Sequence, residues 1–208
     1  MSTPRPIVTL TTDFGEGSRY VAAMKGALLR GNPEVHLVDL SHSIHPQDIE
    51  AGARFLAETI PWFPPGTLHV VVVDPGVGGA RRILYAEWRD KRLVLPDNGL
   101  MTCFAEKEKP TRMFILNNPD WWHGDVAPTF HGRDIFAPVA AHLSRGRDPV
   151  GLGPMVSTMV TLPLSKAARV GQKIEGEVVE IDSFGNLVTD IGLELLDGVP
   201  RDDSVRIA

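Results

Sequence analysis

Acidic side chains recur where strands of this sequence are expected to end. Asp13 follows a β-branched, apolar run at residues 7–11, and Asp74 follows a continuous apolar run at residues 68–73. Asp39 and Asp97 stand at the ends of two further short runs. In open α/β sheets, ligands gather beyond the carboxyl ends of the strands, so we expect Asp13 and Asp74 to converge on one rim. Such a rim can bind a sugar diol, a cation or a metal ion.

Two cationic or titratable features follow these loops. Arg81 and Arg82 come directly after the glycine-rich residues 74–79 and can carry positive charge to the same rim, although two arginines that open a strand are also ordinary solvated side chains. His131 precedes a predicted helix, whose N-terminal amide groups favour an anion such as hydroxide. Equally, His131 can pack in a simple capping loop. Each acidic loop alone also fits ordinary turn chemistry.

Several familiar sites are absent from the sequence. Residues 74–79 lack both the Gly-Lys-Ser/Thr ending of a phosphate-binding loop and the spacing of the dinucleotide fingerprint. No Gly-x-Ser-x-Gly occurs, which disfavours a nucleophile-elbow hydrolase. His42 and His45 precede a helix and share no helical face, so we predict no metal site.

The elements that must position these residues alternate between strand and helix. Hydrophobic periodicity predicts strands at residues 7–11, 36–40, 68–73, 83–88, 92–95 and 114–116, and helices at residues 20–30, 48–60 and 134–143. This alternation predicts an α/β fold with a mostly parallel sheet and helices on both faces. We place this N-terminal domain at residues 1–152 and a linker at residues 153–170.

A smaller β-rich domain is predicted at residues 171–208. Residues 176–182 and 187–191 are expected to pair about a turn at residues 183–186. One hairpin and a tail bury little core by themselves, so this domain is expected to be incomplete.

Composition restricts the class of protein. Apolar residues make up 43% of the 208 residues, typical of a soluble domain, and the net charge of −5 argues against nucleic-acid binding. Cys103 is the single cysteine, which fits a reducing compartment. The first six residues lack signal-peptide anatomy, and residues 68–73 are too short to cross a bilayer. We therefore expect a cytoplasmic protein without a membrane partner.

Seven segments, in order along nearly the whole chain, resemble one family. They are residues 10–15, 24–26, 39–42, 73–78 with Arg81 and Arg82, 96–99, 130–134 and 181–187. The family is that of the S-adenosylmethionine hydrolases (adenosine-forming), also called S-adenosylmethionine hydroxide adenosyltransferases, which are relatives of fluorinases and chlorinases. The resemblance implies an α/β domain followed by a small β-barrel-like domain. It also implies a homotrimer with sites between the large domain of one subunit and the small domain of the next.

The resemblance implies a role for each matched residue. Three residues would position and activate water: Asp74, Arg81 and His131. Four would bind substrate: Asp13 at the ribose hydroxyls, Asp182 at the methionine amino group, Asn186 at the adenine, and Phe184. The implied reaction is attack of water or hydroxide on the ribose 5′ carbon of S-adenosylmethionine, which gives adenosine and methionine without a metal or cofactor. The halogenating relatives carry tyrosine where this chain has Asp74, so the resemblance favours hydrolysis.

The sequence departs from the family pattern in three places. Ser18 stands where an acidic residue is common, and Asp190 stands where asparagine is usual. The chain ends at Ala208, short of the segment that closes the adenine and carboxylate pockets in the family, so we expect a truncated C-terminal domain.

Two other functions stay open. The first is a non-catalytic protein that binds S-adenosylmethionine or adenosine, for which tight binding without turnover is expected. The second is a metal-dependent hydrolase of nucleosides or phosphoesters that uses Asp13, Asp39 and Asp74, for which a chelator would abolish activity.

Overall fold

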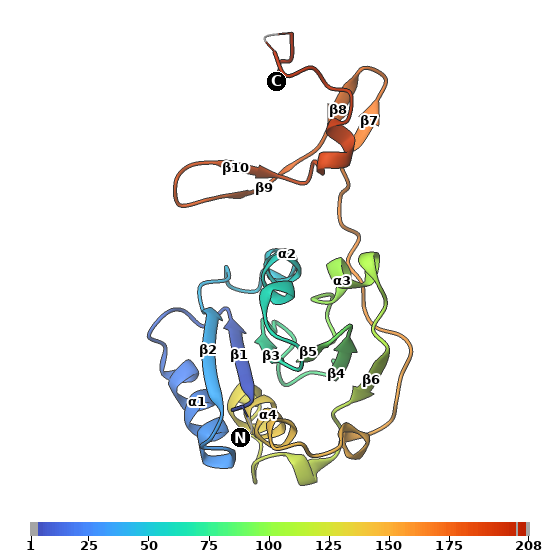
Figure 1. The fold of residues 1–208 in the computed structure, drawn as a ribbon. Helices are drawn as coiled ribbons and strands as arrows, with labels where there is room; N and C mark the ends of the chain where they lie inside the picture. Colours follow the sequence, from blue (N-terminus) through green and yellow to red (C-terminus); the bar gives the residue numbers. More distant parts are fainter. Residues whose placement is uncertain (1–3, 203, 207–208) are drawn as a thin grey trace. The chain divides into compact units, whose positions relative to one another are not determined.

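The computed structural model describes residues 4–202 and 204–206, and the chain divides into two compact units (Figure 1). The first unit comprises residues 1–162 and the second residues 163–208. The division falls inside the segment predicted to be the linker. The last two residues of the chain, which belong to the predicted second domain, lie outside the described residues, as do residues 1–3 and 203.

A six-stranded sheet forms the centre of the first unit. Its strands are β1 (Ile7–Thr12), β2 (His36–Ser41), β3 (Leu68–Val72), β4 (Ile83–Trp88), β5 (Lys91–Pro96) and β6 (Arg112–Ile115). Their order across the sheet is β2-β1-β3-β5-β4-β6. β2, β1, β3 and β5 run parallel, whereas β4 is antiparallel to both of its neighbours. The predicted α/β fold with a mostly parallel sheet is confirmed.

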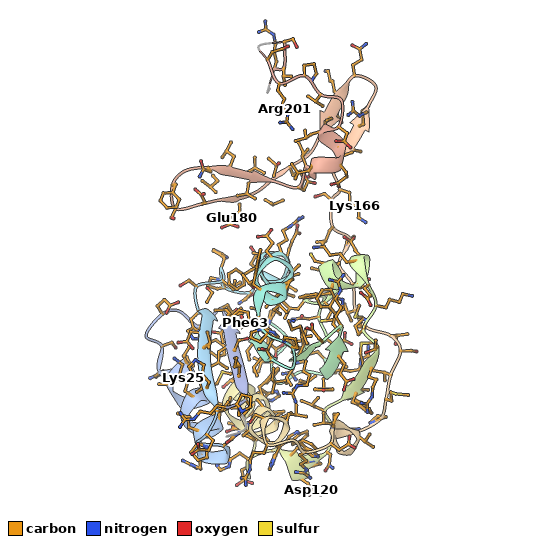
Figure 2. The ribbon with its side chains drawn as sticks, viewed as in Figure 1. Lys25, Phe63, Asp120, Lys166, Glu180 and Arg201 are labelled. Carbon is orange, nitrogen blue, oxygen red and sulfur yellow. The ribbon has the colours of Figure 1, made fainter. Side chains whose placement is uncertain are left out.

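Helices cover both faces of this sheet, as predicted (Figure 1). The four α-helices are α1 (Arg19–Gly31), α2 (Ile49–Thr59), α3 (Thr102–Lys107) and α4 (Ala137–Ser144). Leu68 and Val70 of β3 join the apolar cluster of α1 and α4, whereas Val71 joins that of α2 and α3. Because strand side chains alternate between faces, a strand buried on both sides must be apolar throughout. Figure 2 shows side chains filling both layers.

The structure moves the start of one predicted helix and contains another helix that was not predicted. The helix predicted at residues 134–143 begins earlier, with a π-helical turn at Gly132–Phe136 that continues into α4. α3 was not predicted, because its six residues carry no side-chain cap and are too few to establish a helical period. Asp48 is the N-cap of α2, where aspartate is a preferred residue, and its side chain accepts a hydrogen bond from the Ala51 amide.

The described residues of the second unit contain two antiparallel hairpins and a short 3₁₀-helix at Leu193–Leu196. β9 (Val178–Ile181) pairs with β10 (Leu187–Thr189), which confirms the predicted hairpin about residues 183–186. β7 (Ala168–Val170) pairs with β8 (Lys173–Glu175), a hairpin that was not predicted, because β7 lies in the segment predicted to be a linker. None of the described residues of this unit is buried.

Within residues 4–202 and 204–206, no helix is both long and apolar enough to span a membrane.

His69 is a fully buried titratable group in β3. Its Nδ1 lies 2.7 Å from the hydroxyl oxygen of Thr9 on β1. Burial, together with the nearby Lys91 cation, lowers the pKa of His69 from 6.5 to about 3. The native state therefore holds His69 neutral, whereas the unfolded chain takes up a proton below about pH 6.5.

We predict that His69→Gln flattens the acid side of the stability profile. Above pH 6.5 the His69 ring is neutral in both states and its burial has no protonation cost. As the pH falls from 6.5 toward 3, the unfolded chain binds a proton that the native state does not, and this lowers the free energy of unfolding by roughly 2 kcal/mol at pH 5. Glutamine is neutral throughout and can either donate to or accept from the Thr9 hydroxyl. Denaturant unfolding from pH 7 to 4.5 checks this, and identical pH dependence in both proteins would contradict it.

Candidate active site

Arg81 joins the two other residues predicted to activate water. Its Nε donates to both carboxylate oxygens of Asp74 at 3.1 and 3.0 Å, and its Nη2 donates to Asp74 Oδ2 at 2.6 Å. The same Nη2 lies 2.8 Å from Nδ1 of His131. The Asp74 and Arg81 side chains are only 2% and 12% exposed. The structure thus brings Asp74, Arg81 and His131 together, although they are separated by up to 57 positions.

Glycines allow the loops that carry these residues to approach closely. Gly78, in the loop after β3, has a φ of +77°, and a Cβ atom there would lie 2.7 Å from the carbonyl oxygen of Pro128. A Cβ on Gly132 would lie 2.8 Å from the sulfur of Met24 on α1. The glycine-rich sequence after Asp74 therefore serves loop packing, since only glycine fits this conformation at this distance.

The contact with Arg81 fixes the tautomer of His131. A guanidinium only donates hydrogen bonds, so Nδ1 of His131 must be the acceptor. The neutral ring then carries its proton on Nε2. Burial and the Arg81 cation lower the pKa of His131, against the opposing effect of the Asp74 and Asp134 carboxylates. His131 is therefore held neutral near pH 7 as an Nε2–H donor.

Asp13, the predicted ribose-binding residue, lies in the loop directly after β1. Its Oδ2 accepts a hydrogen bond of 2.9 Å from the backbone amide of Gln47. The ring of Phe14 packs 5.9 Å from that of Tyr20, and Tyr20 packs 5.4 Å from Phe130. These aromatic contacts connect the Asp13 loop to the loop that carries His131, so both loops belong to the same rim of the sheet.

Arg82 forms structural contacts and does not join the charged group around Asp74, although its position in the sequence allowed either. Its Nε donates to Asp97 Oδ2 at 2.7 Å, and its Nη2 donates to the carbonyl of Thr158 at 3.0 Å. Asp97 also accepts from the amide of Val160 at 2.8 Å. Arg82 and Asp97 together attach the chain segment around residue 160 to the sheet.

The other three predicted substrate-binding residues belong to the second unit. Asp182 Oδ1 accepts from the amides of Phe184 and Asn186 at 2.9 and 2.8 Å, and its Oδ2 accepts from Asn186 Nδ2 at 2.7 Å. These hydrogen bonds hold the pKa of Asp182 below its ordinary value. The Phe184 side chain, at the tip of this hairpin, is 90% exposed. Within this unit, Asp182 and Asn186 form one turn, and their predicted substrate contacts stay predictions.

Asp134 is a site-supporting residue that the sequence analysis did not single out. It is buried and accepts from Arg133 at 2.6 and 2.9 Å and from the amide of Ala127 at 3.0 Å. Burial opposes its ionisation, but these hydrogen bonds keep the pKa of Asp134 below its ordinary value. Its position three residues after His131, at the start of a predicted helix, was the available signal.

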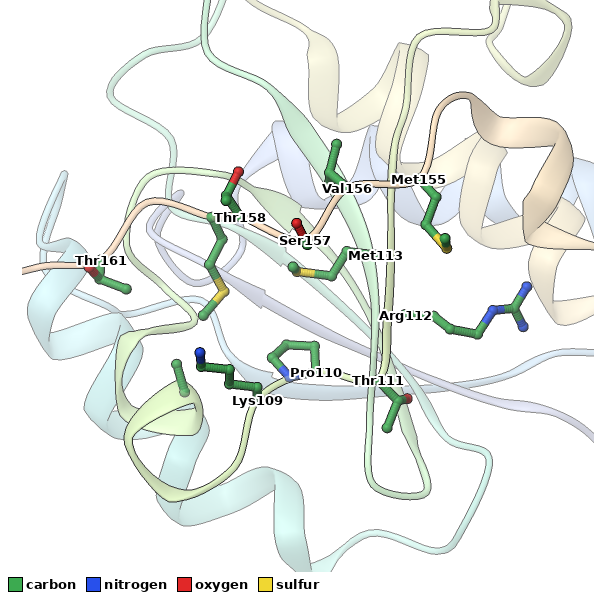
Figure 3. Close-up of a pocket in the computed structure, with 12 residues that line it drawn as sticks. Lys109, Pro110, Thr111, Arg112, Met113, Met155, Val156, Ser157, Thr158 and Thr161 are labelled. Carbon is green, nitrogen blue, oxygen red and sulfur yellow. The ribbon is translucent and has the colours of Figure 1, made fainter.

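A separate cavity of ≈ 680 Å³ lies at the β6 edge of the first unit (Figure 3). Met113, Met155 and Met159 line it with Lys109 and Arg112. It contains none of the seven predicted site residues.

Two of the three carboxylates proposed for a metal-dependent alternative are bound by protein cations, and the third, Asp13, accepts from the amide of Gln47. Asp74 pairs with Arg81, and Asp39 pairs with Lys25 at 2.5 Å. Among the residues that the structure describes, no three His, Cys, Asp or Glu side chains form a group suited to a metal ion. This donor set does not fit a carboxylate metal centre, because the charges of Asp39 and Asp74 are already balanced by Lys25 and Arg81.

The fold and site define an α/β protein with a charged site beyond the carboxyl ends of parallel strands. A model of the SAM hydroxide adenosyltransferase N-terminal domain matches residues 8–153. The "(R)-S-adenosyl-L-methionine hydrolase" of Salinispora tropica is 41% identical over 207 residues, which is 98% of this chain and 78% of that protein. The protein of the same name from Thermus thermophilus is 42% identical and is aligned over 90% of this chain and 74% of its own length.

A solved structure shares the fold. It is an "uncharacterized conserved protein" from Thermotoga maritima with a TM-score of 0.87 and 35% identity, and the match covers 92% of this chain and 73% of that one. The chain therefore belongs to the S-adenosylmethionine hydroxide adenosyltransferase family, which confirms the resemblance seen in the sequence.

We predict that Arg81→Gln raises the pKa of His131. The substitution removes a cation that disfavours imidazolium and leaves the Asp74 and Asp134 carboxylates, which favour it. An NMR titration of the His131 ring protons measures the change. Arg82→Gln is the matched control, because Arg82 pairs with Asp97 and should leave the His131 titration unchanged. An unaltered His131 pKa in Arg81→Gln would contradict the assignment.

Proposed function

We propose that this protein hydrolyses S-adenosylmethionine to adenosine and methionine. The observation that carries the proposal is the single guanidinium of Arg81 bound to both Asp74 and His131 at the rim of the sheet. Family membership and the names of the relatives support the substrate. Asp13, on a neighbouring loop, would hold the ribose hydroxyls.

The reaction needs a nucleophile in line with the scissile bond. An oxygen–carbon bond forms at the ribose 5′ carbon while the carbon–sulfur bond breaks, and its electron pair goes to the sulfonium. Methionine leaves as a neutral thioether, so no general acid is needed. Holding water in line with this bond can supply an effective molarity on the order of 10⁵ M or more.

Each charged group has a defined task in this mechanism. Arg81 stabilises the negative charge that develops as water becomes hydroxide. His131, with its proton on Nε2, donates a hydrogen bond to the attacking oxygen and is not the base. Asp74 retains acceptor capacity beyond its bonds to Arg81 and takes the proton that water releases.

The same groups favour water over a halide as nucleophile. A halide would have to approach the buried carboxylate of Asp74, and like charges at short range repel strongly away from bulk water. Water instead gains an acceptor for its proton. The proposed nucleophile is therefore water, without a metal or cofactor.

The assembly and compartment are part of the proposal. We propose a homotrimer in the cytoplasm, with the substrate-binding residues of the second unit completing the site of a neighbouring subunit. Light scattering during size-exclusion chromatography measures the subunit number, and a monomer that is fully active would contradict this arrangement.

We predict that Asp74→Ala and His131→Ala lower turnover far more than they weaken binding. Loss of one proton-transfer or hydrogen-bonding group typically costs roughly 10²–10⁴-fold in rate. The assay incubates each protein with S-adenosylmethionine and chelator, follows adenosine and methionine by chromatography, and measures Kd by calorimetry. His123→Ala, at an exposed histidine of the same segment, is the control and should retain turnover.

Three results would overturn the proposal. Tight binding of S-adenosylmethionine without any product would identify a binding protein. Loss of activity with chelator would favour the metal-dependent alternative. Variants that weaken binding but keep the wild-type turnover would contradict the assigned roles.

A further inference from the structure

A series of polar side chains reaches the Asp13 loop from the neighbouring strand. Lys25 Nζ of α1 donates to Asp39 Oδ2 of β2 at 2.5 Å, and Asp39 Oδ1 lies 3.1 Å from Nε2 of His42 without hydrogen-bond alignment. On the other side of the ring, His42 Nδ1 lies 2.9 Å from the hydroxyl oxygen of Thr12. Thr12 is the residue directly before Asp13.

The direction of the Thr12–His42 contact follows from the carboxylate on the other side of the ring. Thr12 Oγ1 accepts a hydrogen bond of 3.2 Å from the amide of Phe14, which closes a small turn around Asp13. A carboxylate only accepts hydrogen bonds, so Asp39, which faces Nε2, favours the tautomer with the imidazole proton on Nε2, and Nδ1 then accepts from the Thr12 hydroxyl. Although an acid, an imidazole and a hydroxyl in series resemble a nucleophile triad, the Thr12 side chain is fully buried and is not accessible to a substrate.

A register shift between two strands creates this contact. β1 and β2 pair Leu10 with Asp39 but Thr11 with Ser41, so one extra residue, Leu40, is accommodated in β2. Without the shift, Thr12 would stand beside Ser41, whereas with it Thr12 stands beside His42. Bulges of this kind redirect side chains and recur beside active sites.

The backbone of His42 also holds the loop. Its carbonyl accepts from the amide of Gly15 at 2.8 Å, and its amide donates to the Glu16 carboxylate at 3.1 Å. A few residues on, Gln47 contributes the amide that binds Asp13, and its φ of 67° is uncommon for a residue other than glycine. Residues 42–47 thus contact the Asp13 loop at four points along its length.

We propose that His42 is a positioning residue, which acts through the Thr12 hydroxyl to hold the Asp13 carboxylate in the orientation that binds the ribose diol. This inference rests on the proposed function, since it takes Asp13 as the ribose-binding group. His42 touches no reacting atom. Its effect is confined to recognition of the hydroxyls that Asp13 contacts.

The test compares the Kd values of adenosine and 2′-deoxyadenosine by calorimetry. A hydrogen bond to a carboxylate makes wild-type protein prefer adenosine by about 10-fold or more. Asp13→Ala should bring the ratio of the two Kd values close to one, and this value defines complete loss of the preference for adenosine. Thr12→Val, which removes the hydroxyl at nearly constant volume, and His42→Ala should lower the ratio to within about 3-fold of that limit. Thr12→Ser should restore the wild-type ratio.

Controls separate positioning from loss of structure. A general structural defect weakens both nucleosides alike and leaves their ratio unchanged, so a wild-type ratio in Thr12→Val and His42→Ala overturns the proposal. His36→Ala, at an exposed histidine of β2, should keep the wild-type ratio. If wild-type protein turns over S-adenosylmethionine but binds both nucleosides equally, the positioning role is wrong while the function stands. If it shows neither turnover nor nucleoside binding, the function itself is wrong.

Discussion

The bidentate contact between Arg81 and Asp74, extended to His131, is the interaction on which the site depends. Removing one partner of a buried ion pair leaves an uncompensated charge, which typically costs about 3–5 kcal/mol. The rest of the first unit holds these three side chains together. Asp74 and Arg81 lie seven residues apart on the one loop that connects β3 to β4, and the π-helical turn after His131 brings the ring to the guanidinium.

Burial on both faces of the sheet gives these loops a rigid base. Four of the five residues of β3 are apolar, and Leu68, Val70 and Val72 lie in one apolar cluster while Val71 lies in the other. The loops at its carboxyl end then pack against one another through Gly78 and the aromatic contacts of Tyr20. Precise placement matters for a displacement reaction, because a misalignment of about 1 Å can cost roughly 10²-fold in rate.

Much of this arrangement could be predicted from sequence, and the remainder has identifiable physical reasons. The apolar run of β3 and the acidic residue after it signal a buried strand with a polar end, so Asp13 and Asp74 could be placed on one rim. The separate contacts of Arg81 and Arg82 could not be predicted, because both residues lie in the loop before β4, where no strand or helix period fixes the direction of a side chain. The contact of Thr12 with His42 depends on a one-residue register shift that leaves no mark in the composition of β2. The six residues of α3 are too few to show a helical period in the sequence.

The central claim is that the Asp74–Arg81–His131 group directs water to the ribose 5′ carbon. The most direct measurement is a single turnover of S-adenosylmethionine in ¹⁸O-labelled water, with chelator present and halide absent, followed by mass spectrometry of both products. Our account predicts one ¹⁸O atom in the 5′ hydroxyl of adenosine and none in methionine. Unlabelled adenosine, or label introduced at a different carbon, would contradict it.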